Sequence, residues 1–123
     1  MGLDELRSIF ALRQAGVRML SEAQGLPIYA VEFSADNFDS RLLIVLRGLP
    51  NLRQVQLSGT SVTDDDMRHI GALRMLTGVG LDQTAITDAG LGSLKSLRYL
   101  VHVECEGTQI TEGGLKGVLK DPR

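Results

Sequence analysis

Four polar side chains in the second half of the chain could do chemistry together. His102, Glu104 and Glu106 alternate along one segment, so on a β-strand they would share a face, and Asp82 lies 24 residues before Glu106. Carboxylates with one imidazole can hold a divalent ion. Their spacing matches no established metal motif, and we expect no metal site. The four residues are expected either to attract a basic or hydrogen-bonding partner or to form a solvated acidic face.

Other candidates for catalysis have structural explanations. Cys105 stands at an inward, leucine-equivalent position, which favours a small core residue over a nucleophile. His69 is expected to face solvent beside the inward Ile70. A glycine pair, Gly78-x-Gly80, falls inside an expected strand and not at a strand-to-helix turn, so it does not indicate a nucleotide site. The sequence contains no phosphate-binding loop, paired catalytic acids or zinc spacing. We therefore expect no catalytic residue, cofactor or enzymatic activity.

A threonine-centred motif recurs every 24 residues. Its copies are Thr60-Ser61-Val62-Thr63-Asp64, Thr84-Ala85-Ile86-Thr87-Asp88 and Thr108-Gln109-Ile110-Thr111-Glu112. A fixed period in the twenties is typical of supersecondary units that stack and bury a shared core. The first threonines, at 60, 84 and 108, are expected to satisfy backbone groups in the turns between stacked coils. The motif therefore specifies a scaffold.

The residues around each motif predict a strand followed by a helix. The apolar positions are Leu52-x-x-Val55-x-Leu57, Leu76-x-x-Val79-x-Leu81 and Leu100-x-x-Val103-x-Cys105, with a degenerate copy at Ile28-x-x-Val31-x-Phe33. Their alternation indicates a short strand with one inward face. Helical spacing follows, as in Leu91, Leu94 and Leu97. The second threonine of each motif is expected to cap the helix, and the acid after it to favour the helix dipole.

This pattern resembles that of leucine-rich repeats over about residues 25–119. Thr87-Asp88-Ala89-Gly90-Leu91 is similar to the "TDAGL" subtype, which is frequent in bacteria, planctomycetes especially, and related to the cysteine-containing repeats of F-box proteins. Asp65-Asp66-Met67 departs from it. The resemblance implies a single-domain α/β, right-handed solenoid with a parallel sheet. It would have an N-terminal capping helix (1–24) and four repeats (25–48, 49–72, 73–96 and 97–120, within 25–123).

Both ends of the array raise a question about partners. Residues 4–23 are expected to form one amphipathic helix, with Gly16 as a break or kink, that covers the first coil with a polar outer face or docks onto a partner. Its apolar positions are Leu6, Ile9, Phe10, Leu12 or Arg13, Val17 and Leu20. At the other end, Leu100, Val103 and Cys105 would lie at an open edge. Either another chain, such as a second copy, covers that edge or it is a ragged terminus.

Outward-facing positions on the strands are the expected binding surface, since such solenoids commonly bind proteins on the concave face. Gly78 and Gly80 are expected to leave a shallow, side-chain-free patch beside the charged residues. The predicted partner-binding residues are Gln54, Gln56, Gly78, Gly80, Asp82, His102, Glu104 and Glu106. We expect a non-catalytic protein-protein interaction module. The alternative is a structural subunit of a homo-oligomer or larger assembly, joined through the C-terminal edge.

Composition narrows the classes of partner. The chain has 123 residues, a formal net charge of −2, 43% hydrophobic residues and one cysteine. That balance fits neither a polycation for nucleic acid nor a disordered acidic tail, and no stretch is apolar enough to span a membrane. The acidic start resembles neither a signal peptide nor a myristoylation signal. We expect a cytoplasmic location, because a single cysteine fits a reducing compartment, and no nucleic-acid or membrane partner.

Overall fold

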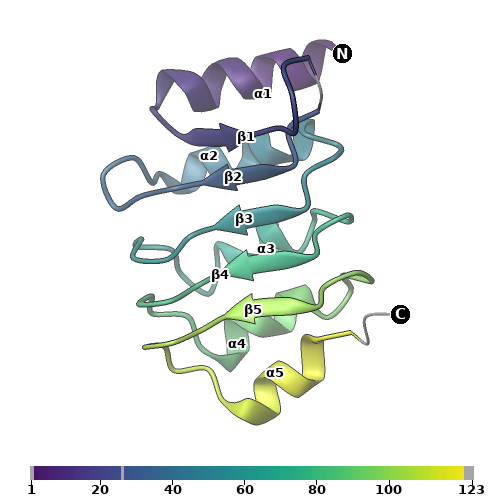
Figure 1. The fold of residues 1–123 in the computed structure, drawn as a ribbon. Coiled ribbons are helices and arrows are strands. Elements are labelled where there is room, and N and C mark those ends of the chain that lie inside the picture. Colours follow the sequence, from purple (N-terminus) through teal and green to yellow (C-terminus); the bar gives the residue numbers. More distant parts are fainter. Residues whose placement is uncertain (1, 26, 121–123) are drawn as a thin grey trace.

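A computed structural model of the chain describes residues 2–25 and 27–120 and has an α/β fold. Its sheet has the strand order β1-β2-β3-β4-β5, with α2, α3 and α4 behind it and α1 and α5 at opposite ends of the stack (Figure 1). The strands are β1 (Arg18–Leu20), β2 (Ala30–Glu32), β3 (Gln54–Gln56), β4 (Gly78–Gly80) and β5 (His102–Glu104). The helices are α1 (Leu3–Gln14), α2 (Ser40–Val45), α3 (Met67–Ile70), α4 (Asp88–Leu91) and α5 (Glu112–Val118), with short 3-10 turns η1 (Leu46–Gly48) and η2 (Gly92–Leu94).

The register of the sheet follows the sequence period. Strands β2 to β5 are parallel, and Gln54 pairs with Gly78, which in turn pairs with His102. Each of these partners is 24 residues from the next. The predicted parallel sheet is confirmed for β2 to β5, and equivalent positions of the sequence units therefore form columns across its open face.

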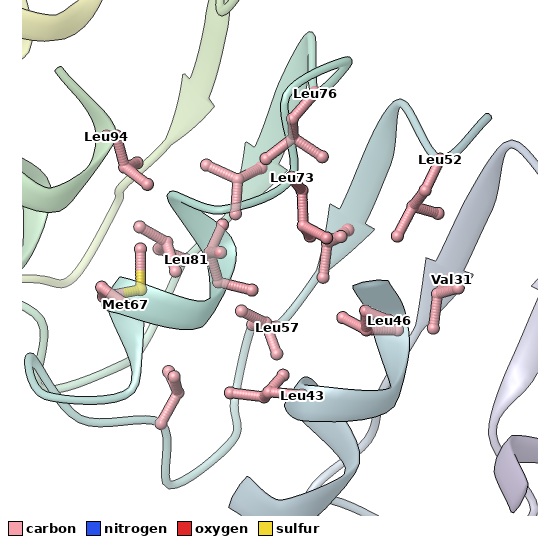
Figure 2. Packing of buried hydrophobic residues seen from close by; sticks show 14 of the residues in the cluster. Val31, Leu43, Leu46, Leu52, Leu57, Met67, Leu73, Leu76, Leu81 and Leu94 are labelled. Atoms are coloured by element: carbon pink, nitrogen blue, oxygen red, sulfur yellow. The ribbon is translucent and has the colours of Figure 1, made fainter. Parts of the chain in front are cut away.

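The core lies between the sheet and its helices. Val55 and Val79, at the centres of β3 and β4, are each 2% exposed, and Leu57 and Leu81 just after these strands are fully buried. Leucines and a methionine from α2, η1, α3 and η2 pack against them (Figure 2). The inward positions predicted from the alternating and helical spacings therefore form one continuous cluster, which fixes the strands that carry the candidate site.

The predicted long helix over residues 4–23 is wrong. Helix α1 ends at Gln14, and Gly16 adopts φ 78°, a left-handed conformation that glycine adopts at little cost. The N–H of Gly16 bonds to the carbonyl of Arg13, and that of Val17 to the carbonyl of Leu12, which is the Schellman pattern. The chain then reverses, and β1 pairs antiparallel with β2. The amphipathic spacing continues past Gly16, but the break predicted at this glycine is confirmed.

Helix α1 also buries a different face from the one its apolar residues suggested. Leu12 is fully buried and Ser8 is 5% exposed, with the Ser8 hydroxyl donating a 2.6 Å bond to the Val45 carbonyl. Leu6 and Phe10, expected on the inward stripe, are 51% and 65% exposed. The outer face of α1 therefore carries large apolar side chains beside the exposed Arg7 and Arg13, so the expected polar outer face is wrong in part. Within the described part of the chain, no helix combines the length and apolar character needed to cross a membrane.

Candidate binding surface

Strands β2 to β5 form an open groove on the face of the sheet opposite the helices. Its volume is about 390 Å³, and all three residues of β4 are buried along its floor. It contains six of the eight predicted partner-binding residues, namely Gln54, Gln56, Gly78, Gly80, His102 and Glu104. Asp82 and Glu106 lie outside it. Thr77 and Val101 also line the groove, and their places one residue before β4 and β5 are the signal that could have identified them.

Gln56 lies across Gly80 and reaches the strand beyond it. Its Nε2 donates a 3.0 Å hydrogen bond to Oε1 of Glu104, and its Oε1 accepts the N–H of Ser58 at 2.9 Å. A methyl group at position 80 would overlap the Gln56 amide. The expected side-chain-free patch is therefore wrong at Gly80, where the glycine makes room for a bridge from β3 to β5.

Gly78 is the open part of the groove floor. A Cβ built there would approach the Cβ of His102 at 3.7 Å, an ordinary van der Waals contact. Beside it, Nε2 of His102 lies 3.7 Å from Oε2 of Glu104. The Glu104 carboxylate is thus contacted on one oxygen by Gln56 and approached on the other by His102. Together these groups give the groove one open glycine and one positioned anion.

Asp82 and Glu106 belong to a hydrogen-bond ladder outside the groove. The Asp82 N–H donates to Oγ of Ser58 at 3.0 Å, and Oδ1 of Asp82 accepts the Glu106 N–H at 2.7 Å. Each bond joins residues 24 apart. The Asp82 carboxylate therefore holds neighbouring turns together, while Glu106 is exposed. The four polar residues singled out from the sequence do not converge on one point.

Cys105 follows β5 and is half-buried. Burial, with a smaller contribution from the charge of Asp82, raises the pKa of its thiol above the usual range. A raised pKa disfavours the thiolate, which is the nucleophilic form. These surroundings are consistent with the packing role expected from the sequence, although the residue is less enclosed than its counterpart Leu81.

The first threonines of the motif act within their own turns. The hydroxyls of Thr60, Thr84 and Thr108 donate to the carbonyls of Leu57, Leu81 and Cys105 at 2.6, 2.7 and 2.6 Å. The prediction that they satisfy backbone groups is confirmed. Each accepting carbonyl is three residues earlier in the same turn, so the hydroxyls close the turns themselves.

The second threonine and the acid after it connect successive units. Oδ1 and Oδ2 of Asp64 accept the N–H and hydroxyl of Thr87 at 2.9 and 2.6 Å, and Asp88 binds Thr111 in the same way at 2.8 and 2.6 Å. The bonds from the Thr111 hydroxyl and N–H lower the pKa of Asp88. Thr87 and Thr111 also cap α4 and α5, as predicted. The clamp was missed, and its sequence signal is the Asp-to-Thr spacing of 23.

A glycine three residues after the second threonine of the motif leaves space for this clamp. A Cβ at Gly90 would overlap Asp64, and one at Gly114 would overlap Asp88. In the second unit the equivalent residue is Asp66 instead of glycine. The position 24 residues before Asp64, from which a clamp to this unit would come, is Ser40. There Oδ2 of Asp66 accepts the N–H of Thr63 at 3.0 Å and the hydroxyl of Ser40 at 3.1 Å. The departure at Asp65-Asp66-Met67 therefore has a steric and hydrogen-bonding reason.

No protein-family model matches the chain, and no curated protein matches it. Function is therefore inferred from the residues and the geometry above.

Proposed function

We propose that the chain is a right-handed leucine-rich-repeat solenoid that acts as a non-catalytic protein-binding module through the concave face of its sheet. Three features support the solenoid. They are the 24-residue apolar pattern, the 24-residue pairing register from β2 to β5, and the clamps from Asp64 to Thr87 and from Asp88 to Thr111. The single cysteine supports a cytoplasmic location, where thiols remain reduced.

The groove over β4 is the observation that carries the binding function. Positions that pack or clamp are alike from unit to unit, whereas the groove column of Gln54, Gly78 and His102 differs at every step. Packing does not determine which residues occupy these outward positions. Binding to a partner can therefore determine them. The groove holds Gly78 as an open floor and Glu104 as an anion fixed by Gln56, features that suit shape and hydrogen-bond recognition.

The chemistry of the groove favours a basic partner. Among the described residues that line it, the charged ones are Glu32 and Glu104 with His102 beside them, and none is lysine or arginine. Oε1 of Glu32 already lies 3.6 Å from Nε of Arg18. Glu104 is therefore the main anion for a partner, and we propose a protein segment that brings a lysine or arginine to Glu104 and a backbone or small side chain over Gly78.

Partner capture from the native host tests this function. Glu104→Lys should abolish enrichment of proteins that the unaltered chain captures. Asp65→Lys makes the same charge change at an exposed position of the second unit, outside the groove, and should leave capture intact. Equal capture by both variants would remove the groove from the function.

A structural subunit joined through the C-terminal edge is the second candidate function. Val79, Leu81 and Ile86 are at most 2% exposed, but their counterparts one unit later, Val103, Cys105 and Ile110, are only half-buried. In each earlier unit, these apolar positions are covered by the unit that follows it. Light scattering tests the idea. A mass above that of one chain that falls on Val103→Lys supports it, and a single-chain mass at every concentration opposes it.

A further inference from the structure

Helix α1 presents an apolar and cationic surface to solvent. Leu3, Leu6 and Phe10 are 63%, 51% and 65% exposed. Exposed Arg7 and Arg13 lie beside this stripe and line a shallow depression with Leu6 and Phe10. At about 100° per residue, Asp4 and Glu5 lie on the side of Ser8 and Leu12, with Asp4 exposed and Glu5 half-buried. The outer face therefore combines hydrophobic side chains with positive charge.

The opposite end of the strand stack has matching character. Val103, Cys105, Ile110 and Leu115 are half-buried there and form an apolar edge. In the preceding unit the N–H groups of Leu81 and Gln83 donate to the carbonyls of Glu104 and Glu106. Within residues 2–25 and 27–120, the equivalent N–H groups of Cys105 and Gly107 donate no hydrogen bond. This edge thus has both apolar surface and free backbone donors, which favours pairing with another element.

Two acidic residues lie at this edge, at the ends of the two series of hydrogen bonds between side chains and the following unit. Asp82 accepts the Glu106 N–H, and Asp88 clamps Thr111, so the next acceptors in the two series are Glu106 and Glu112. Both are exposed. Oε1 of Glu112 lies 3.9 Å from Nζ of Lys116, on its own helix. These carboxylates suit guanidinium groups, which bind carboxylates with two parallel hydrogen bonds.

We propose that copies of this chain associate head to tail, with the outer face of α1 in one copy seated on the C-terminal edge of the next. Leu6 and Phe10 contact the apolar edge, and Arg7 and Arg13 pair with Glu106 and Glu112. Helix α1 and β5 with α5 lie at opposite ends of the stack (Figure 1), so the two surfaces face outward in opposite directions. Such a contact joins two different surfaces and can extend to further copies.

This inference rests on the second candidate function and identifies the partner of the edge. An anionic membrane also suits an apolar helix with arginines. A second copy is favoured because the complementary acids and apolar side chains are present on the same chain, and one contact covers both exposed surfaces.

Sedimentation velocity across a range of concentrations, with charge-reversed variants, tests the association. Arg7→Glu with Arg13→Glu, and separately Glu106→Lys with Glu112→Lys, should each reduce the protein to a monomer. An equimolar mixture should regain the assembly, because an acidic α1 then meets a basic edge. Arg68→Glu with Arg74→Glu, exposed positions in the middle of the stack, controls for net charge and should assemble normally. Circular dichroism confirms that every variant is folded.

Three results would overturn the inference, and they separate it from the function on which it rests. A wild-type protein that stays monomeric at all concentrations excludes both the head-to-tail association and the structural-subunit function. An assembly lost on reversal of Glu106 and Glu112 but unaffected by reversal of Arg7 and Arg13 keeps the edge as an interface and excludes α1 as its partner. Co-sedimentation of the monomer with phosphatidylserine vesicles, without self-association, assigns α1 to a membrane.

Discussion

Gln56 on β3 donates a hydrogen bond to Glu104 on β5 over a distance of 3.0 Å, passing across Gly80 on the strand between them. The three residues occupy one column of the sheet, one per strand. The glycine is therefore part of a polar bridge, and the bridge fixes the groove carboxylate that lies 3.7 Å from Nε2 of His102.

Gly80→Ala should destabilise the protein by about 1 kcal/mol, because the added methyl group displaces the Gln56 amide and breaks its bond to Glu104. The same change in a Gln56→Ala background should cost less, since the bond is already absent. Urea denaturation of the four proteins measures this coupling. Gly78→Ala, which meets only ordinary contacts, is the matched control. Equal costs for Gly80→Ala in both backgrounds would contradict the bridge.

The sequence predicted the columns but not the bridge. Alternation placed Gln56, Gly80 and Glu104 on the outward face, and the parallel register confirmed that they are neighbours. Spacing alone does not tell whether a long side chain crosses a glycine, so it does not predict the bridge. The clamps were missed for a related reason. Helix capping and the helix dipole already account for Thr87 and Asp64, so their pattern does not call for a bond between them.

Gly90→Ala should destabilise the protein by about 1–3 kcal/mol, because its methyl group would overlap Asp64, which clamps Thr87. Gly92→Ala is the control. It lies two residues along, with φ −55° and open space around a built Cβ, and should be neutral or slightly stabilising. Thermal and urea unfolding would measure both. Similar costs at the two positions would mean that helix formation, and not the clamp, decides the outcome.

The clamp from Asp88 to Thr111 should make stability depend on pH. Bonds from Thr111 lower the Asp88 pKa, so the folded protein holds the carboxylate charged more readily than the unfolded chain does. Its stabilisation is present above the unfolded pKa of about 3.9 and is lost as pH falls through the folded value. The stability difference between wild type and Asp88→Asn should therefore be largest at neutral pH and shrink below about pH 4.

Asp65→Asn controls for that measurement, because Asp65 is exposed and forms no clamp. Its urea midpoint should follow the wild-type midpoint across the same pH range. An Asp88→Asn difference that stays constant from neutral to acidic pH would contradict a charged clamp.

Leu12→Ala should destabilise the protein by about 2–5 kcal/mol, since Leu12 is fully buried between α1 and the first unit. Leu6→Ala should change the stability of the monomer by no more than about 0.5 kcal/mol, because Leu6 is 51% exposed in the single chain. Both leucines fit the amphipathic spacing, so sequence alone could not rank them. Only the burial of Ser8 and Leu12, on a helix that contacts α2 and η1, identifies the inner face. The reverse order of costs would show that α1 buries its other side.

Binding in the groove over β4 is the central claim, and Gly78→Leu tests it most directly. The leucine would fill the open floor without changing charge, and Gly78 has no positive φ that a side chain would strain. Calorimetric titration with a captured partner should show at least a tenfold loss of affinity, equivalent to about 1.4 kcal/mol, with the fold and the unfolding midpoint retained. Unchanged affinity in a folded Gly78→Leu protein would place the binding surface elsewhere.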